Sequence, residues 1–223
     1  MKTEFVSGTR PVSPWAFGLA CFDACLNKTR NVARGLTQRY GTETIKRKLW
    51  DAEFSRGRWN CLESMPDDCV YAHVERHANH GSILDLGCGP GTTGAELAAD
   101  SYTRYTGVDI SAVAVEKARQ KAEAHHRADT NRYFQGDIFS YVPNRTHDVI
   151  LFGDSLYYVP QRLILSMLNR YSQYLKATGV FVARIYGRRY QRIVDVIEDN
   201  FEVVEKRVYC ADDGDVFVLA FRA

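Results

Sequence analysis

The sequence has no long apolar run and few cysteines, and each absence excludes a class of protein. None of its 223 residues belongs to a stretch approaching the roughly 20 apolar residues that span a bilayer. The best candidate, 15–25, contains Asp23 and lacks a basic start followed by a small-residue cleavage site, so we expect a packed or amphipathic helix there. Six cysteines without a CxxC pair are too few for a disulfide scaffold. We therefore expect reduced thiols and a cytoplasmic protein.

Strong bias in composition or net charge is also missing. Hydrophobic residues make up 45% and charged residues 25%, which is typical of a soluble globular chain and excludes a disordered one. A net charge of +2 argues against a protein whose whole surface binds nucleic acid. The length suits one compact catalytic domain with an extension, and no internal repeat is visible.

The charge is unevenly spread along the chain. Residues 1–60 carry 11 basic and 5 acidic side chains, a balance of +6, so residues 61–223 carry −4. Within 28–50 the apolar residues have a broadly helical spacing, with Gly35 and Gly41 as breaks. We predict a helical extension or lid over 1–60 and the main domain over 61–223. The basic helix is either a solvated face or a lid that attracts an anionic substrate such as a phosphate, sulfate or carboxylate.

From residue 81 onward, short apolar runs alternate with segments of helical period. This alternation predicts a doubly wound, mostly parallel sheet with helices on both faces, and a terminal hairpin makes the last strand antiparallel, giving seven strands. The expected strands are 82–86, 105–109, 132–135, 148–152, 180–185, 202–209 and 216–222, and the expected helices are 92–99, 112–124, 162–175 and 190–198.

The most informative segment is the glycine loop after the first strand. Gly87, Gly89 and Gly91 lack Cβ atoms where the strand turns into a helix, so a ligand can lie against bare backbone. Residues 89–94 also fit GxGxxG, the dinucleotide fingerprint. However, Pro90 removes a backbone N–H that a pyrophosphate would need, and Asp85 adds a carboxylate that repels phosphates. We therefore predict a phosphate-free nucleoside with positive charge.

Residues 83–94 resemble motif I of the class I S-adenosylmethionine-dependent methyltransferases of small-molecule type. The segments 107–111, 135–139 and 148–158 follow in that family's order. The resemblance covers roughly residues 60–223. It implies a Rossmann-like seven-stranded sheet with a reversed last strand, S-adenosylmethionine as cofactor and S-adenosylhomocysteine as product.

The resemblance implies two groups of cofactor contacts. At the glycine loop, the three glycines would let the methionine part and the ribose approach the backbone, and Asp85 would face the amino end. At the next two strand ends, Asp109 would accept the ribose hydroxyls, and Ile110 would pack on the adenine. Asp137 would accept from the adenine amino group, while the Ile138 backbone N–H would bind the ring.

The acceptor side is expected near the end of the fourth strand. Methyl transfer from a sulfonium is an in-line displacement that needs mainly positioning, with a base only for a poor nucleophile. Asp154 is a candidate for binding the cofactor ammonium group or acting as a base, or else it caps the next helix. Tyr157 and Tyr158 either line the acceptor pocket or are packed aromatics. The segment does not resemble the Asn/Asp-Pro-Pro-Tyr/Phe motif of enzymes that methylate nucleobase or glutamine amides.

Two further segments supply candidate substrate contacts. Arg184 and Tyr186 end the fifth strand, and a buried Arg184 needs a carboxylate from the protein or the substrate. Residues 49–62 resemble the segment that closes over the cofactor in small-molecule members. The aromatic side chains of that segment, Trp50, Phe54 and Trp59, would cover the cofactor, and Tyr40 and Arg58 are further substrate-binding candidates.

The histidines are not expected to hold a metal. His73, His77 and His80 have helical spacing, but HVERH is not the HExxH zinc pattern and no partner obviously converges on them. His125 and His126 end a helix, where the dipole favours them.

Three functions remain open at this point. The first is a methyltransferase acting on an oxygen or nitrogen of a small metabolite or sugar-like acceptor, without nucleic acid as partner. The second methylates RNA or protein through the basic N-terminal region. The third is a non-catalytic S-adenosylmethionine-binding module. A closed aromatic cavity would favour the first, and a broad positive groove the second.

Overall fold

The computed structural model describes residues 31–65, 68–209 and 215–223. The expectations for 15–25, for Cys21 and Cys25, and for the loop 211–214 lie outside these residues. Within the described part, no helix has both the length and the apolar character needed to cross a membrane.

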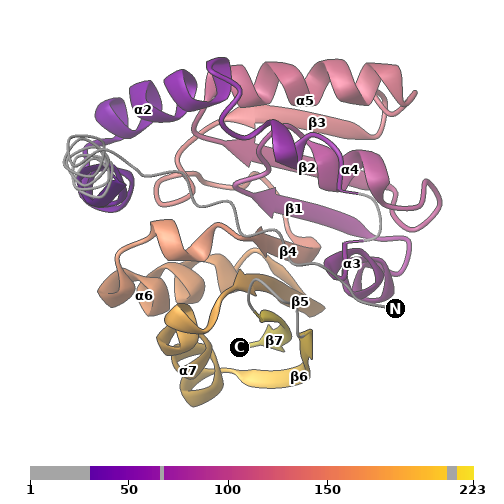
Figure 1. Cartoon of the computed structure of the whole chain (residues 1–223). Coiled ribbons are helices and arrows are strands. Elements are labelled where there is room, and N and C mark those ends of the chain that lie inside the picture. The colour runs from indigo at the N-terminus through magenta and orange to yellow at the C-terminus, as the bar shows by residue number, and fades with distance from the viewer. Residues whose placement is uncertain (1–30, 66–67, 210–214) are drawn as a thin grey trace, which may run out of the picture.

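The sheet has seven strands in the order β3-β2-β1-β4-β5-β7-β6 (Figure 1). Strands β1 to β5 pair in parallel, and β7 runs antiparallel to both β5 and β6. The predicted fold class is therefore confirmed. The strands are β1 (Ser82–Leu86), β2 (Arg104–Asp109), β3 (Asn131–Gln135), β4 (His147–Gly153), β5 (Leu175–Tyr186), β6 (Glu202–Tyr209) and β7 (Val216–Arg222).

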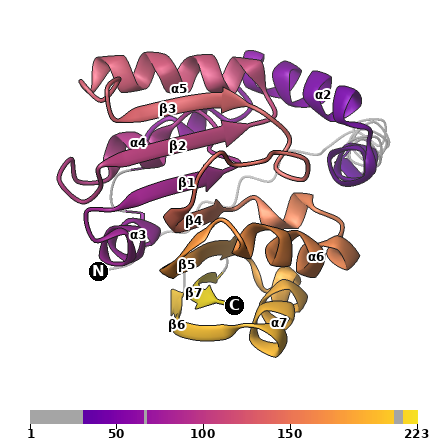
Figure 2. The same cartoon turned by 180° about the vertical axis from the view of Figure 1, so that it is seen from behind.

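Helices cover both faces of the sheet because alternate strand residues point to opposite sides. Leu84 and Leu86 of β1 pack in a cluster that contains residues of α6 and α7, whereas Ile83 packs in a cluster with residues of α3 and α5. Figure 2 shows this layering from behind. The helices are α2 (Glu43–Ser55), α3 (Val70–Ala78), α4 (Thr92–Glu96), α5 (Ala112–Ala124), α6 (Gln161–Ser172) and α7 (Gln191–Asn200), with 3₁₀ turns η1 (Asn60–Leu62), η2 (Leu156–Tyr158) and η3 (Arg188–Tyr190).

The expected boundaries differ from the observed ones by more than two residues in three places. The helix after the glycine loop ends at Glu96 instead of 99, because Leu97 leaves the helix with an extended backbone and becomes fully buried. Helix α6 ends at Ser172 instead of 175, and β5 begins at Leu175, which pairs with His147. Gly179 permits this longer β5, since a Cβ there would lie 2.8 Å from the His147 carbonyl oxygen.

Two helices lie beyond the carboxyl ends of the central strands. Residues 31–40 are helical, and α2 follows after a short break. Gly41 is the break that was expected, whereas Gly35 lies inside the helix, where a Cβ would meet nothing within 4 Å. Figure 1 shows both helices on the side toward which the arrowheads of β1 and β2 point, above α6. We call residues 31–62 the cover.

Candidate active site

A cavity of about 400 Å³ lies between the cover and the carboxyl ends of the strands. The sheet contributes residues that follow β1, β2, β3 and β4, and the cover contributes residues of the helix 31–40, of α2 and of η1. The start of α6 completes the lining. The predicted residues that line the cavity are Tyr40, Trp50, Phe54, Trp59, Gly87, Gly89, Asp109, Ile110, Asp137, Ile138, Asp154, Tyr157 and Tyr158.

The glycine loop turns sharply under the cavity. Gly87, Gly89 and Gly91 have φ values of +88°, +53° and +77°, a region that favours glycine. A Cβ on Gly87 would lie 2.6 Å from the Ser155 Cβ, whereas on Gly89 it would meet only Phe54, at 3.9 Å. Gly89 therefore offers bare backbone to a ligand. Gly91 does not line the cavity, because it packs against Ala118 of α5.

Backbone amides hold Asp109 at the end of β2. Its carboxylate oxygens accept hydrogen bonds from the Gly89 N–H at 2.9 Å and the Ser111 N–H at 2.8 Å. Burial raises the pKa of Asp109 to about 6, although both hydrogen bonds oppose the shift. Ser111 caps α5 by accepting from the Ala114 N–H, so Asp109 is not needed as the cap.

Asp137, after β3, forms an ion pair with Lys46 of α2. Its other oxygen accepts from the Phe139 N–H at 2.9 Å. Lys46 was not predicted as a site residue, although the spacing of Lys46, Trp50 and Phe54 at intervals of four places all three on one helix face. All three line the cavity.

Asp154 follows β4 with φ at +52° and forms an ion pair with Arg184. Arg184 also contacts Asp68, with Nε 3.1 Å from Oδ1, so it meets carboxylates of the protein itself. Burial raises the pKa of Asp154 to about 6, and Arg184 opposes that shift. Asp154 lines the cavity, whereas Arg184 and Tyr186 do not.

Asp85 and Arg58 also stand outside the cavity lining. Asp85 is 2% exposed and accepts a hydrogen bond from the Tyr105 hydroxyl. Burial raises its pKa to about 7, against the effect of that hydrogen bond. Successive side chains of a strand point to opposite faces of the sheet, so Asp85 lies on the same face as Ile83 and on the opposite face from Leu84 and Leu86. Arg58 is exposed.

An aromatic wall joins the cover to the segment after β4. The Trp50 ring lies edge-on to Tyr158, with centroids 4.9 Å apart, and 5.7 Å from Trp59. Tyr157 stacks on Tyr190 at 4.4 Å. Burial raises the pKa of Tyr157 and Tyr158 above the ordinary value, so both hydroxyls are neutral near pH 7.

Polar contacts fix the cover on the domain. The Arg39 guanidinium donates from Nε and Nη2 to the Tyr157 carbonyl, at 3.1 and 2.7 Å. The Ser111 hydroxyl donates to Asp51 of α2 at 2.7 Å. Glu53, a buried residue that the sequence analysis did not single out, accepts from the Trp59 indole N–H at 2.9 Å.

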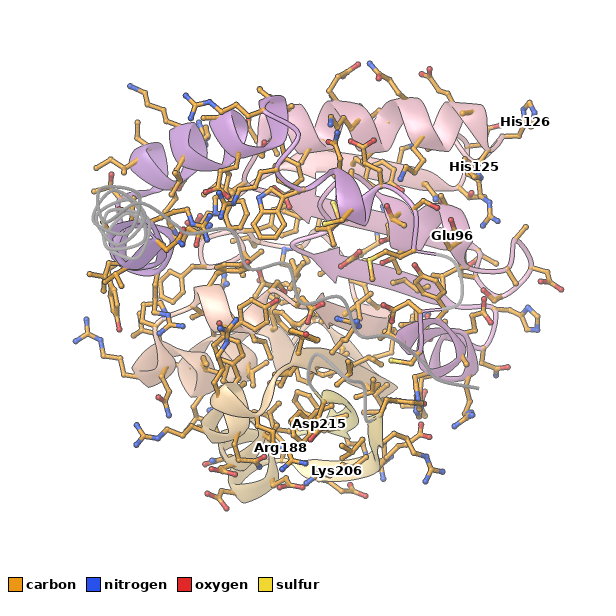
Figure 3. All side chains as sticks on the ribbon, in the orientation of Figure 1. Glu96, His125, His126, Arg188, Lys206 and Asp215 are labelled. Atoms are coloured by element: carbon orange, nitrogen blue, oxygen red, sulfur yellow. The ribbon has the colours of Figure 1, made fainter. Side chains whose placement is uncertain are left out.

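The histidines lie away from the cavity. Figure 3 shows His125 and His126 at the far end of α5, and the Arg188–Asp215 ion pair at the opposite side of the molecule. His73 and His77 each lie 3.1 Å from the Glu205 carboxylate. Among the described residues, no group of three or more His, Cys, Asp or Glu side chains is arranged to hold a metal ion.

Part of the chain around this cavity is similar to known methyltransferases. Residues 83–179 match a family model described as a methyltransferase domain. A ribosomal protein L11 methyltransferase of Acetivibrio thermocellus is 28% identical over 55% of this chain and 38% of its own length. A ubiquinone biosynthesis O-methyltransferase of Rickettsia canadensis is 25% identical over 66% of this chain and 61% of its own. The chain thus spans less than two thirds of either relative.

A solved structure supports the same assignment of fold. Magnesium protoporphyrin IX methyltransferase from Synechocystis PCC 6803, crystallised with bound S-adenosylmethionine, superposes with a TM-score of 0.64 at 18% identity. The match covers 81% of this chain and 97% of that one. The superposition shows the fold that the resemblance implied, and the family model over residues 83–179 supports the resemblance drawn from the sequence.

Proposed function

We propose that the chain is an S-adenosylmethionine-dependent methyltransferase that transfers a methyl group to an oxygen or nitrogen of a small molecule. The cavity carries this proposal, because its volume of about 400 Å³ is that of a small-molecule site and aromatic side chains cover it. Two basic residues of α2, Lys46 and Arg47, are moreover neutralised by Asp137 and Glu43.

The residues present fit the cofactor. The buried Oδ1 of Asp154 and Oγ of Ser155 have no hydrogen-bond partner among the described residues, although both residues line the cavity. A partnerless carboxylate oxygen beside a partnerless hydroxyl suits an ammonium group. Gly87 and Gly89 would lie against the methionine part, Asp109 would accept the ribose hydroxyls, and Asp137 with Ile138 would bind the adenine.

When bound, S-adenosylmethionine supplies a methyl group activated by its sulfonium. The chain's own contribution is to orient the acceptor and exclude water, which are the main requirements of in-line displacement. Trp50 and Tyr158 form the wall that excludes water, and Tyr157 and Tyr158 flank the acceptor as neutral hydroxyls. We assign Asp154 to the cofactor's ammonium group, since its free oxygen is buried in the cavity wall.

Transfer of a labelled methyl group tests this proposal. The protein is incubated with methyl-labelled S-adenosylmethionine and a cell extract divided into small-molecule and polymer fractions. We expect label to enter the small-molecule fraction. Label in RNA or protein would favour the alternative in which the basic N-terminal region binds a polymer, as the L11 methyltransferase relative acts on a protein. Cofactor binding without any transfer would indicate a binding module.

A further inference from the structure

The charged side chains that line the cavity divide into neutralised and unneutralised groups. Three acidic and three basic residues line it: Asp109, Asp137, Asp154, Arg39, Lys46 and Arg162. Each acidic residue is engaged, Asp109 by backbone N–H groups, Asp137 by Lys46 and Asp154 by Arg184. In the proposed function, these three face the cofactor.

Neither Arg39 nor Arg162 forms an ion pair with an acidic side chain among the described residues. The half-buried Arg39 donates from Nε and Nη2 to a neutral carbonyl, that of Tyr157, which leaves its charge unbalanced and its Nη1 donors available. Arg162 is exposed in the first turn of α6 and has no ion pair or hydrogen bond with any described side chain. Both side chains line the same cavity.

The two arginines lie near each other along the fold. Arg39 binds the carbonyl of Tyr157 in η2, and Arg162 follows five residues later, across Pro160, which also lines the cavity. No acidic residue occupies the first turn of α6. The cavity therefore has a positive end made by the helix 31–40 and α6, next to the aromatic rings of Tyr157 and Tyr158.

Resting on the proposed function, we propose that the methyl acceptor carries an anionic oxygen group, a carboxylate or a phosphate, that Arg39 and Arg162 bind. Guanidinium groups match the geometry of both oxyanions and bind them with charge-assisted hydrogen bonds. The rest of the acceptor would be apolar or aromatic, because Trp50, Tyr157 and Tyr158 surround it. An anion at this end would also be attracted by the positive charge of the cofactor.

Calorimetry with simple probes tests this assignment. The protein saturated with S-adenosylhomocysteine is titrated with benzoate, phenyl phosphate and the neutral isostere benzamide. We expect at least one anion to bind on the order of tenfold more tightly than benzamide, because a hydrogen bond to a charged group contributes about that factor. The stronger anion identifies the carboxylate or the phosphate as the recognised group. Equal binding of all three probes, or none, would overturn the assignment.

Three variants locate the effect. Arg162→Gln, which removes no internal contact, should weaken binding of the preferred anion roughly threefold, as expected for an exposed charge, and Arg39→Gln roughly tenfold. Lys48→Gln is the matched control, since Lys48 is an exposed lysine of α2 outside the cavity lining. It should leave anion binding unchanged.

The affinity for S-adenosylhomocysteine separates this inference from the proposed function. We expect it to stay the same in all three variants. If Arg39→Gln or Arg162→Gln weakens cofactor binding as much as anion binding, the arginines serve the cofactor's carboxylate and the inference is wrong. If the unmodified protein does not bind S-adenosylhomocysteine at all, the proposed function itself fails.

Discussion

On the sheet side of the cavity, backbone amides hold the Asp109 carboxylate, whereas polar side-chain contacts fix the cover on the domain. Gly89 and Ser111 donate their N–H groups to Asp109, and the glycine loop sits directly on β1. The cover is fixed by pairs such as Arg39 with the Tyr157 carbonyl and Asp51 with Ser111. Asp109 is thus held by the fold's own backbone, whereas the contacts that fix the cover can change by a few substitutions.

This difference predicts that Asp109, on the sheet side of the cavity, contributes more to cofactor binding than Asp51 on the cover. Asp109→Ala should weaken S-adenosylmethionine binding on the order of a hundredfold, because two hydrogen bonds from ribose hydroxyls to a charged group are lost. Asp51→Ala, which removes the hydrogen-bond partner of the Ser111 hydroxyl, should weaken S-adenosylmethionine binding less than about fivefold. Isothermal titration calorimetry measures both.

Asp109→Ala also leaves the Gly89 and Ser111 amides without their acceptor, so its thermal unfolding must be followed in parallel. Asp109→Asn keeps one acceptor oxygen and serves as the second variant. Unchanged cofactor affinity in a folded Asp109 variant would count against the assigned pocket.

Glycine-to-alanine substitutions should have opposite effects on stability on the sheet side of the cavity and in the cover. Gly87→Ala would place its Cβ 2.6 Å from the Ser155 Cβ at a φ of +88°. We expect a loss of about 1 to 3 kcal/mol of stability and roughly tenfold weaker cofactor binding. Gly35→Ala in the cover helix meets nothing within 4 Å and should instead stabilise by about 0.5 to 1 kcal/mol. Thermal unfolding of both variants compares them. If the two substitutions change stability equally, the predicted difference between the sheet side and the cover is wrong.

Cofactor binding should depend on pH through the carboxylates of Asp109 and Asp154 on the sheet side of the cavity. The pKa values of Asp109 and Asp154 are raised to about 6, so both carboxylates become protonated as the pH falls through 6. We expect affinity for S-adenosylmethionine to fall roughly tenfold for each responsible group between pH 7 and pH 5. Asp154→Asn should remove one of the two titrations. A flat profile across this range would exclude both groups as ionised ligands.

Buried Asp85 should affect stability with the opposite dependence on pH. Its pKa is raised from 3.8 to about 7, so its neutral form is favoured in the folded state. The neutral Asp85 carboxyl therefore contributes to the free energy of unfolding below pH 4, and this contribution is lost as the pH rises through about 7. Asp85→Asn should therefore gain stability relative to the unmodified protein between pH 5 and pH 8, as measured by denaturant unfolding. A constant difference would contradict this assignment.

The smallest expected effect on cofactor binding comes from the ion pair between Lys46 and Asp137, which links the cover to the sheet side. If Asp137 binds the adenine amino group, the cofactor competes with Lys46 for it. Lys46→Met should then strengthen S-adenosylmethionine binding about threefold, the size of one partly exposed ion pair. Lys48→Met, on the exposed face of the same helix, is the control. Weaker binding in Lys46→Met would mean that Lys46 assists the cofactor.

Local sequence determined the sheet and the residues on the sheet side of the cavity. Strands 202–209 and 216–222 were predicted with their observed bounds, because a turn signal separates these two segments. Gly87, Gly89, Asp109 and Asp137 were placed correctly at strand ends, since the carboxyl ends of parallel strands meet at one edge.

Only the tertiary structure decided which side chains meet. Lys46 is 91 residues from Asp137, Arg39 is 118 from Tyr157, and Arg184 is 116 from Asp68. Hydrophobic spacing fixes secondary structure and strand ends, but it carries no information on contacts between such distant segments. Those contacts depend on how the segments before β1 pack against the ends of the strands. Among the three basic residues that line the cavity, they neutralise Lys46 and leave Arg39 and Arg162 without an ion pair among the described residues.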